Sequence, residues 1–400
     1  MLDLGLVQKH LQALESGGEA SRRQAVHFLR QQVEQDWQTA PRPVLHALVE
    51  SLRRELVGMT KQPANRHTYR QEVATALGSL GPASRLAIPE LVELLQEGVL
   101  DHVRAAAATA LAKIGVDGRE HADQRVRSAL VAFWFSPNHA KHVHVRIAYA
   151  LARLKIDAAG LSGFLTSTVV AGEEIALRTA AAEALGWCGK QEVGVVPALL
   201  TAALTDKQEE VRHQAEAALS RLGLSREKSV ELCARQLGPS SYAETALRHS
   251  GPLAVPALLQ ALKTAADAGT REKALRTLGS LGELATAAVP EVTRALRDRD
   301  LELRLAAAKS LWNITRKAEG VVPALVGLLE RKGTPQDDDA RRRFLQTVIE
   351  ALRRIGPPAR AAVPALTRKS RDQNRLVRES AISALREITP NTANRASRRQ

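Results

Sequence analysis

One feature limits the folds open to this chain: a helical pattern that returns at intervals of 28 to 41 residues along most of its 400 residues. Each copy contains an Ala-Leu, Ser-Leu or Thr-Leu pair, and a more divergent copy surrounds Leu29. Internal repeats of this length are typical of stacked units that bury a continuous core between neighbours. Together the copies predict about eleven repeats. Beyond Leu29, the marker leucines are Leu77, Leu111, Leu151, Leu185, Leu219, Leu247, Leu278, Leu311, Leu352 and Leu385.

Each repeat shows two helical segments. The first carries Val-Pro or Ile-Pro near its start, as at Pro89 and Pro256. Proline is tolerated in a first helical turn, because the N–H that it lacks would have no partner there. The second segment ends at a glycine, as in "LSRLG" before Leu224, which is a usual helix exit. No alternation of apolar and polar residues competes with these signals, so we expect an all-α protein built of helical hairpins.

An arginine stands seven residues before the marker leucine in eight of the eleven repeats. In three of these repeats an aspartate precedes the arginine by six residues, at Asp206, Asp298 and Asp372. A guanidinium has five donors in a plane, and its methylene stem can cover apolar surface. We therefore expect these arginines to join stacked repeats by binding turn carbonyls or the aspartates, although ligand binding is an alternative. They are Arg22, Arg70, Arg104, Arg178, Arg212, Arg271, Arg304 and Arg378.

The combination of "VPALL", "VRxxAxxAL" and a closing "LG" resembles the HEAT-repeat family, more narrowly the bacterial type called phycobilisome-lyase HEAT-like repeats. The resemblance runs from about Ile88 to Thr389 and is looser before that. It implies a right-handed α-solenoid whose second helices line a concave groove. We accordingly expect one solenoid domain over residues 1–390, with divergent repeats over 1–83 and regular repeats over 84–390.

The net charge of +14 is concentrated near the C-terminus. Residues 340–400 hold fourteen arginines and one lysine against four acidic residues, and the other 339 residues carry only +3. Such a basic end attracts anionic partners. Residues 391–400 are polar and basic, and we expect them to be disordered. The candidate binding residues are Arg342, Arg343, Arg353, Arg354, Arg368, Lys369, Arg371 and Arg375.

Three interpretations of this basic end stay open. It can be a solvated polar cap on the stack, a site for an acidic protein, or a site for a polyanion such as nucleic acid. Binding to nucleic acid would depend strongly on salt. Phe344 is the lone aromatic residue among these arginines, so stacking on the bases of a single strand is disfavoured.

The fourth and tenth repeats are longer and lack the arginine, and loops in such places often carry recognition. In the tenth repeat three aspartates, at 337–339, precede a helix that we expect to begin near Ala340, where carboxylates suit the helix dipole. The fourth repeat contains three aromatic residues that we expect in the core: Phe133, Trp134 and Phe135. It also holds weak candidate ligands for zinc, copper or nickel: His139, His142 and His144. His144 has the alternative role of replacing the arginine.

Two cysteines, Cys188 and Cys233, follow helical apolar spacing and predict buried free thiols rather than a disulfide framework. No run of eighteen apolar residues predicts a membrane span, and the N-terminus lacks the pattern of a secretory signal. We expect a cytoplasmic protein.

Enzyme motifs are weak in this chain. Relatives of the deoxyhypusine hydroxylase type bind iron through His-Glu pairs, and no His-Glu dipeptide occurs here. "GWCGKQ" lacks the glycine spacing of a phosphate loop, and "GLSGF" is not a nucleophile elbow. We therefore predict a non-catalytic scaffold, without a cofactor, that binds a protein partner through its curved surface. The alternatives are nucleic-acid binding through the Arg-rich C-terminal repeats, and an enzyme such as a lyase or DNA glycosylase.

Overall fold

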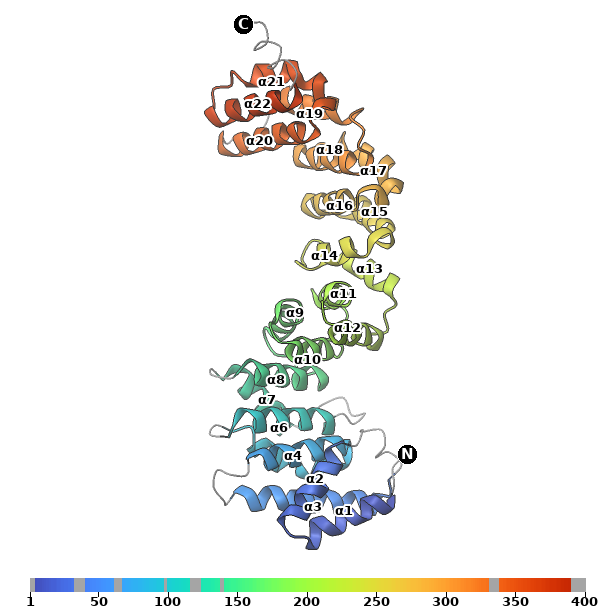
Figure 1. Cartoon of the computed structure of the whole chain (residues 1–400), viewed down its shortest axis with the longest axis vertical. Helices are drawn as coiled ribbons and strands as arrows, with labels where there is room; N and C mark the ends of the chain where they lie inside the picture. Colours follow the sequence, from blue (N-terminus) through green and yellow to red (C-terminus); the bar gives the residue numbers. More distant parts are fainter. Residues whose placement is uncertain are drawn as a thin grey trace, which may run out of the picture. The chain divides into compact units, whose positions relative to one another are not determined.

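A computed structural model of the chain describes residues 4–31, 40–60, 67–96, 99–115, 124–136, 140–330 and 338–389. Every regular element in these segments is a helix, and the helices form eleven successive hairpins, so the all-α prediction is confirmed (Figure 1). Contacts between Cα atoms divide the chain into an N-terminal unit, Met1–Ser225, and a C-terminal unit, Arg226–Gln400.

The N-terminal unit contains six hairpins, and each pairs an odd-numbered helix with the even-numbered helix that follows it. The even-numbered helices pack against one another in chain order, which makes a stack within the unit. The helices are α1 (Leu4–Ser16), α2 (Glu19–Gln31), α3 (Arg42–Thr60), α4 (His67–Ser79), α5 (Ile88–Glu93), α6 (Asp101–Ile114), α7 (Gln124–Phe135), α8 (Lys141–Arg153), α9 (Leu161–Ala171), α10 (Ile175–Leu185), α11 (Val195–Thr205) and α12 (Glu209–Arg221).

The C-terminal unit contains five hairpins with the same order of packing along its even-numbered helices. Short 3₁₀ turns precede three of its odd-numbered helices: η3 (Gly251–Ala254), η4 (Gly282–Ala288) and η5 (Pro357–Ala362). The helices are α13 (Arg226–Arg235), α14 (Ala243–His249), α15 (Val255–Thr264), α16 (Ala268–Ser280), α17 (Val289–Ala295), α18 (Leu301–Thr315), α19 (Val321–Glu330), α20 (Asp338–Ile355), α21 (Val363–Lys369) and α22 (Arg375–Ile388).

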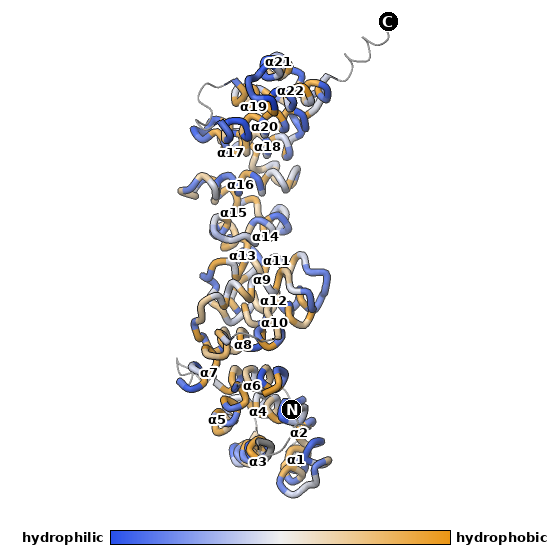
Figure 2. Tube along the Cα trace, turned by 90° about the vertical axis from the view of Figure 1, so that its left-hand side faces the viewer, coloured by the Kyte–Doolittle hydropathy of each residue, from blue (hydrophilic) through white to orange (hydrophobic). Residues whose placement is uncertain are grey.

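Local sequence signals set the ends of these helices. The prolines of the Val-Pro pairs occupy the first turn, as Pro256 does in α15. A glycine with a positive φ follows many second helices, for example Gly282 after α16, with a φ of 58°. Small side chains then let neighbouring second helices approach closely, since a Cβ added at Gly279 of α16 would lie 2.8 Å from the Ser310 Cα of α18. The core is built mainly of alanine, leucine and valine, and both hydrophobic and hydrophilic residues occur along the trace of the stacked helices (Figure 2).

The prediction that arginines join successive repeats is confirmed most clearly at Arg178. Its guanidinium donates to the carbonyls of Gly172 and Glu173 in its own repeat, at 2.9 and 3.2 Å. It also donates to both carboxylate oxygens of Asp206 in the next repeat, at 2.8 and 3.1 Å. The backbone carbonyl of Asp206 in turn accepts a hydrogen bond from Arg212 at 2.9 Å. One aspartate thus links the arginines of two repeats.

Where the arginine is missing, other side chains take its place. His144 stacks on Trp134 with ring centroids 4.2 Å apart and meets the edge of Phe164 at 4.7 Å. In the tenth repeat the position belongs to Leu345, which is buried, and Asp372 of the next repeat binds Lys369 instead, at 3.5 Å.

Two expectations about the long repeats need correction. Phe133 and Trp134 are buried, as predicted, but the Phe135 side chain is 61% exposed, because it is the last residue of α7 and lies beyond the packed face. The helix expected near Ala340 begins at Asp338, so its first turn contains the carboxylates of Asp338 and Asp339. Residues 391–400, expected to be disordered, lie outside the described residues. Among the segments described, no helix combines the length and apolar character that a membrane crossing needs.

Candidate functional site

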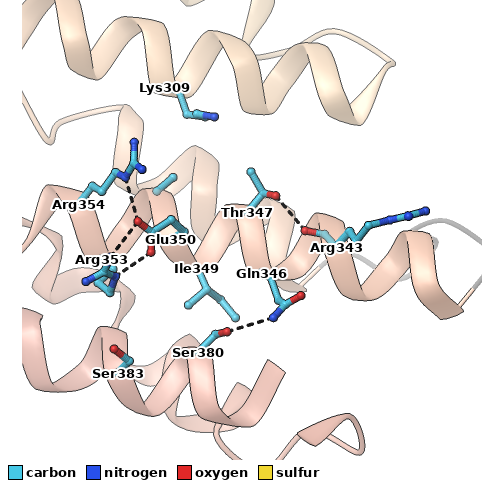
Figure 3. Close-up of a pocket in the computed structure, with 11 residues that line it drawn as sticks. Lys309, Arg343, Gln346, Thr347, Ile349, Glu350, Arg353, Arg354, Ser380 and Ser383 are labelled. Carbon is cyan, nitrogen blue, oxygen red and sulfur yellow. Dashed lines mark hydrogen bonds and ion pairs between the residues drawn. The ribbon is translucent and has the colours of Figure 1, made fainter. Parts of the chain in front are cut away.

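A groove of about 910 Å³ lies in the C-terminal unit between three second helices, α18, α20 and α22. Figure 3 shows Lys309 on α18 at one side and Ser380 and Ser383 on α22 at the other. The side chains between them come from α20, and they include Gln346 and Thr347. The groove therefore lies between the second helices of consecutive hairpins. The family resemblance implied that second helices line a concave surface.

The register of the repeat explains why these residues share one surface. Lys309, Glu350 and Ser383 each stand two residues before the marker leucine of their repeat. Stacked helices in the same register present equivalent positions to the same side, so all three line the groove. Sequence reasoning missed Lys309 and Glu350 because it searched for runs of basic residues. The register relative to the marker leucine was the signal that could have found them.

The charges of the groove are unbalanced. Its lining includes four cations, Lys309, Arg343, Arg353 and Arg354, and a single carboxylate, Glu350. Glu350 accepts hydrogen bonds from Arg353 at 2.7 and 3.0 Å and from Arg354 at 2.9 Å. The bonds from Arg353 outweigh the opposite effect of burial and, with those from Arg354, hold the pKa of Glu350 below its ordinary value. This carboxylate therefore stays ionised at neutral pH.

Lys309 and Arg343 are exposed, and neither forms an ion pair with a carboxylate of the described residues. Figure 3 shows the Arg343 side chain extending away from Glu350, toward the other end of α20. The groove thus offers two cations that are not held in an ion pair, together with the neutral donors and acceptors of Gln346 and Thr347. It is suited to bind an anion.

The eight basic residues proposed from the sequence do not act as one surface. Arg343, Arg353 and Arg354 line the groove, whereas the other five lie outside its lining. Of these five, Arg371 is exposed, and the others are paired with acidic residues. The pairs are Arg342 with Asp339, Arg368 with Glu330, Lys369 with Asp372, and Arg375 with Glu379.

The histidine candidates do not assemble into a metal site in the segments described. His142 is exposed on α8, and His144 packs against Trp134. His139 lies outside the described residues. Across the described ranges, no group of three or more His, Cys, Asp or Glu side chains is arranged to hold a metal ion.

Both cysteines are free and buried, as predicted. Burial, with a contribution from the charge of Glu192, raises the pKa of the Cys188 thiol to about 12. Burial also raises the pKa of the Cys233 thiol well above its ordinary value. A thiol must ionise to act as a nucleophile, so neither cysteine is poised for covalent catalysis.

Comparison with known families decides the class of the repeats. Residues 255–346, which include α15 to α19 and reach the groove residues Arg343 and Gln346, match a family model of HEAT repeats. This segment of the chain contains HEAT repeats. The narrower likeness to phycobilisome-lyase repeats stays a prediction, and a search of curated proteins finds no match.

The solved structures that resemble this chain are distant from it in sequence. Kap121p bound to Pho4p is 15% identical, with a TM-score of 0.39, over 97% of this chain and 46% of that one. A model of the full-length AP-3 complex is 13% identical, with a TM-score of 0.41, over 98% and 70%. Human deoxyhypusine hydroxylase is 20% identical, with a TM-score of 0.25, over 76% and 97%. The chain spans less than half of the Kap121p chain, and likenesses this distant carry no argument about function.

Proposed function

We propose that this HEAT-repeat protein is a non-catalytic scaffold that binds an acidic segment of a partner protein in the groove between α18, α20 and α22. The observation that carries the proposal is the excess of positive charge in the groove, where Lys309 and Arg343 form no ion pair with a carboxylate of the described residues. A cationic groove raises the local concentration of anionic partners and speeds their association.

The dimensions of the groove suit a short peptide. Arg343 and Arg354 are eleven residues apart on α20, which corresponds to about 16 Å along a helix. An extended peptide covers this distance with about five residues. The volume of about 910 Å³ lies within the range of ordinary ligand sites. A segment with several acidic residues can therefore meet the cations at both ends of α20 at once.

The polar side chains of the groove favour a peptide over a nucleic acid. Gln346, Thr347, Ser380 and Ser383 can donate to and accept from peptide groups. None of the groove-lining residues that the structure describes is aromatic, so the stacking surfaces typical of single-strand binding are missing from this set. We also propose a reducing compartment such as the cytoplasm, which the free cysteines support.

A binding titration tests the proposal. The probe is a fluorescent Gly-Ser peptide that carries five consecutive glutamates, and anisotropy is followed at two salt concentrations. The double variant Lys309→Glu with Arg343→Glu should bind about tenfold or more weakly than the unmodified chain, because two attractions become repulsions. Its matched control is Arg294→Glu with Arg371→Glu, which reverses two exposed arginines of the same unit outside the groove lining.

The control variant should bind within about twofold of the unmodified chain if the groove is the site, since exposed charges at a distance are screened by salt. Equal losses in both variants would mean general attraction to a basic protein and would overturn the proposal. Labelled duplex and single-stranded DNA are titrated in parallel. Tighter binding of either DNA, abolished by the groove variant, would replace the acidic peptide with nucleic acid as the ligand.

A further inference from the structure

We infer that Glu350 is a resident counter-anion, which occupies the guanidinium groups of Arg353 and Arg354 and so lowers the affinity of the groove for any incoming anion. This inference rests on the proposed function and goes further by naming a residue that limits the affinity of the groove for its ligand. A single carboxylate gains little at Arg353 and Arg354, because it only replaces the carboxylate of Glu350.

The hydrogen bonds of Glu350 are those that a ligand would need. Its Oε2 accepts from Arg353 Nε at 2.7 Å, while its Oε1 accepts from Arg353 Nη2 at 3.0 Å and from Arg354 Nε at 2.9 Å. Two parallel N–H···O bonds from one guanidinium are the preferred geometry for a carboxylate or phosphate. Glu350 therefore uses the best anion-binding geometry in the groove.

Stability alone does not explain this arrangement. The side chains of Glu350 and Arg353 are 38% and 39% exposed, and that of Arg354 is 73% exposed. Ion pairs in such exposed positions contribute little to the free energy of unfolding. We expect Glu350 to affect anion binding more than it affects the free energy of unfolding, since it is the one carboxylate among four cations in the described lining.

The position of Glu350 also favours selection by charge. It lies between Arg353 and Arg354, at the end of α20 opposite Arg343 (Figure 3). A segment with several acidic residues can replace Glu350 at Arg353 and Arg354 with one carboxylate. Its other carboxylates still gain attraction to Arg343 and Lys309. The groove thus favours multiply charged segments, which can meet Arg343 and Lys309 and also replace Glu350 at Arg353 and Arg354.

The variant Glu350→Gln removes the charge and preserves the shape of the side chain. It should bind the five-glutamate peptide about three- to tenfold more tightly than the unmodified chain at low salt, since a repulsive charge near the ligand is gone. The matched control is Glu379→Gln on α22, which removes an exposed carboxylate paired with Arg375 outside the groove lining. It should change the affinity by less than about twofold, because exposed charges outside the site are screened.

Each result has one meaning. Tighter binding by Glu350→Gln alone supports the inference. Unchanged or weaker binding by Glu350→Gln, with normal binding by the unmodified chain, overturns the inference and leaves the proposed function standing. An equal gain in both variants also overturns it, since net charge would then be the cause. Absence of binding by both the unmodified chain and Glu350→Gln overturns the proposed function itself. Thermal unfolding of each variant confirms that the fold is intact.

Discussion

Replacement of Asp206 by alanine removes the carboxylate that joins the fifth and sixth repeats. The side chains of Arg178 and Asp206 are 13% and 8% exposed, so the pair is largely shielded from water. Two hydrogen bonds link them, from Arg178 Nε and Nη2 to the two carboxylate oxygens, at 2.8 and 3.1 Å. After the substitution, Arg178 keeps its bonds to the carbonyls of Gly172 and Glu173 but loses its counter-charge.

The size of the effect follows from these contacts. Hydrogen bonds to a charged group contribute about 1.5–3 kcal/mol, and loss of one partner of a buried pair costs about 3–5 kcal/mol. Because Arg178 retains two carbonyl acceptors, we expect a cost below that of a fully orphaned charge, about 2–3 kcal/mol, for Asp206→Ala. A double-mutant cycle with Arg178→Met should give a coupling energy of about 2 kcal/mol.

The assay is urea unfolding followed by circular dichroism, combined with hydrogen exchange. Stacked repeats unfold as neighbouring blocks, so a weaker seam should also reduce cooperativity and raise exchange in α10 and α12 first. The control cycle uses Lys228 and Glu231, a pair at 2.9 Å whose side chains are 64% and 48% exposed. That cycle should give at most a few tenths of a kcal/mol. A coupling between Arg178 and Asp206 no larger than the control value would refute the view that these arginines join the repeats.

Three further predictions concern packing, pH and thiols. Gly279→Ala should destabilise the protein by about 1–2 kcal/mol, because the added Cβ meets Ser310. Gly163→Ala should stabilise it slightly, because a Cβ added there has no neighbouring atom within 4 Å. Chemical denaturation measures both effects. Burial raises the pKa of Asp206, but hydrogen bonds from Arg178 and the Gln208 N–H outweigh it, so the pKa lies below its ordinary value. The pair therefore stabilises the fold above about pH 4, and this stabilisation is lost as the pH falls further. In the variant Asp206→Asn this contribution to the pH dependence of the free energy of unfolding should be absent. Both buried cysteines should resist a thiol reagent in the native protein and react in urea; rapid native labelling at either would contradict their burial.

The hairpins were predictable because the forces that form them act over short distances in the chain. The apolar spacing, the proline in a first turn and the glycine after a second helix each involve neighbouring residues, and α15 with Pro256 and Gly282 after α16 follow these rules. The exposure of Phe135 was not predictable, since an aromatic residue at the end of a helix has the same local pattern whether or not a neighbour covers it.

The candidate site was predictable only in part. The excess of arginine near the C-terminus pointed correctly to α20, where Arg343, Arg353 and Arg354 line the groove. It also included residues whose charges are already neutralised, three of them by an acid three or four residues away and one by an acid that is distant in sequence. Arg368 binds Glu330, which is 38 residues earlier, and a count of charges within one segment misses such a pair.

By itself, the amino-acid sequence determined that this protein is a series of helical hairpins held by repeated arginines, because helix periodicity, capping and the repeat register are properties of local sequence. The tertiary structure decided which charges remain available. It brought Lys309 of α18 beside α20 and paired Arg368 of α21 with Glu330 of α19. The reason is physical: a charge is neutralised by whatever lies within a few ångströms of it, and where the partner is distant in sequence only the stacking of helices brings the two together.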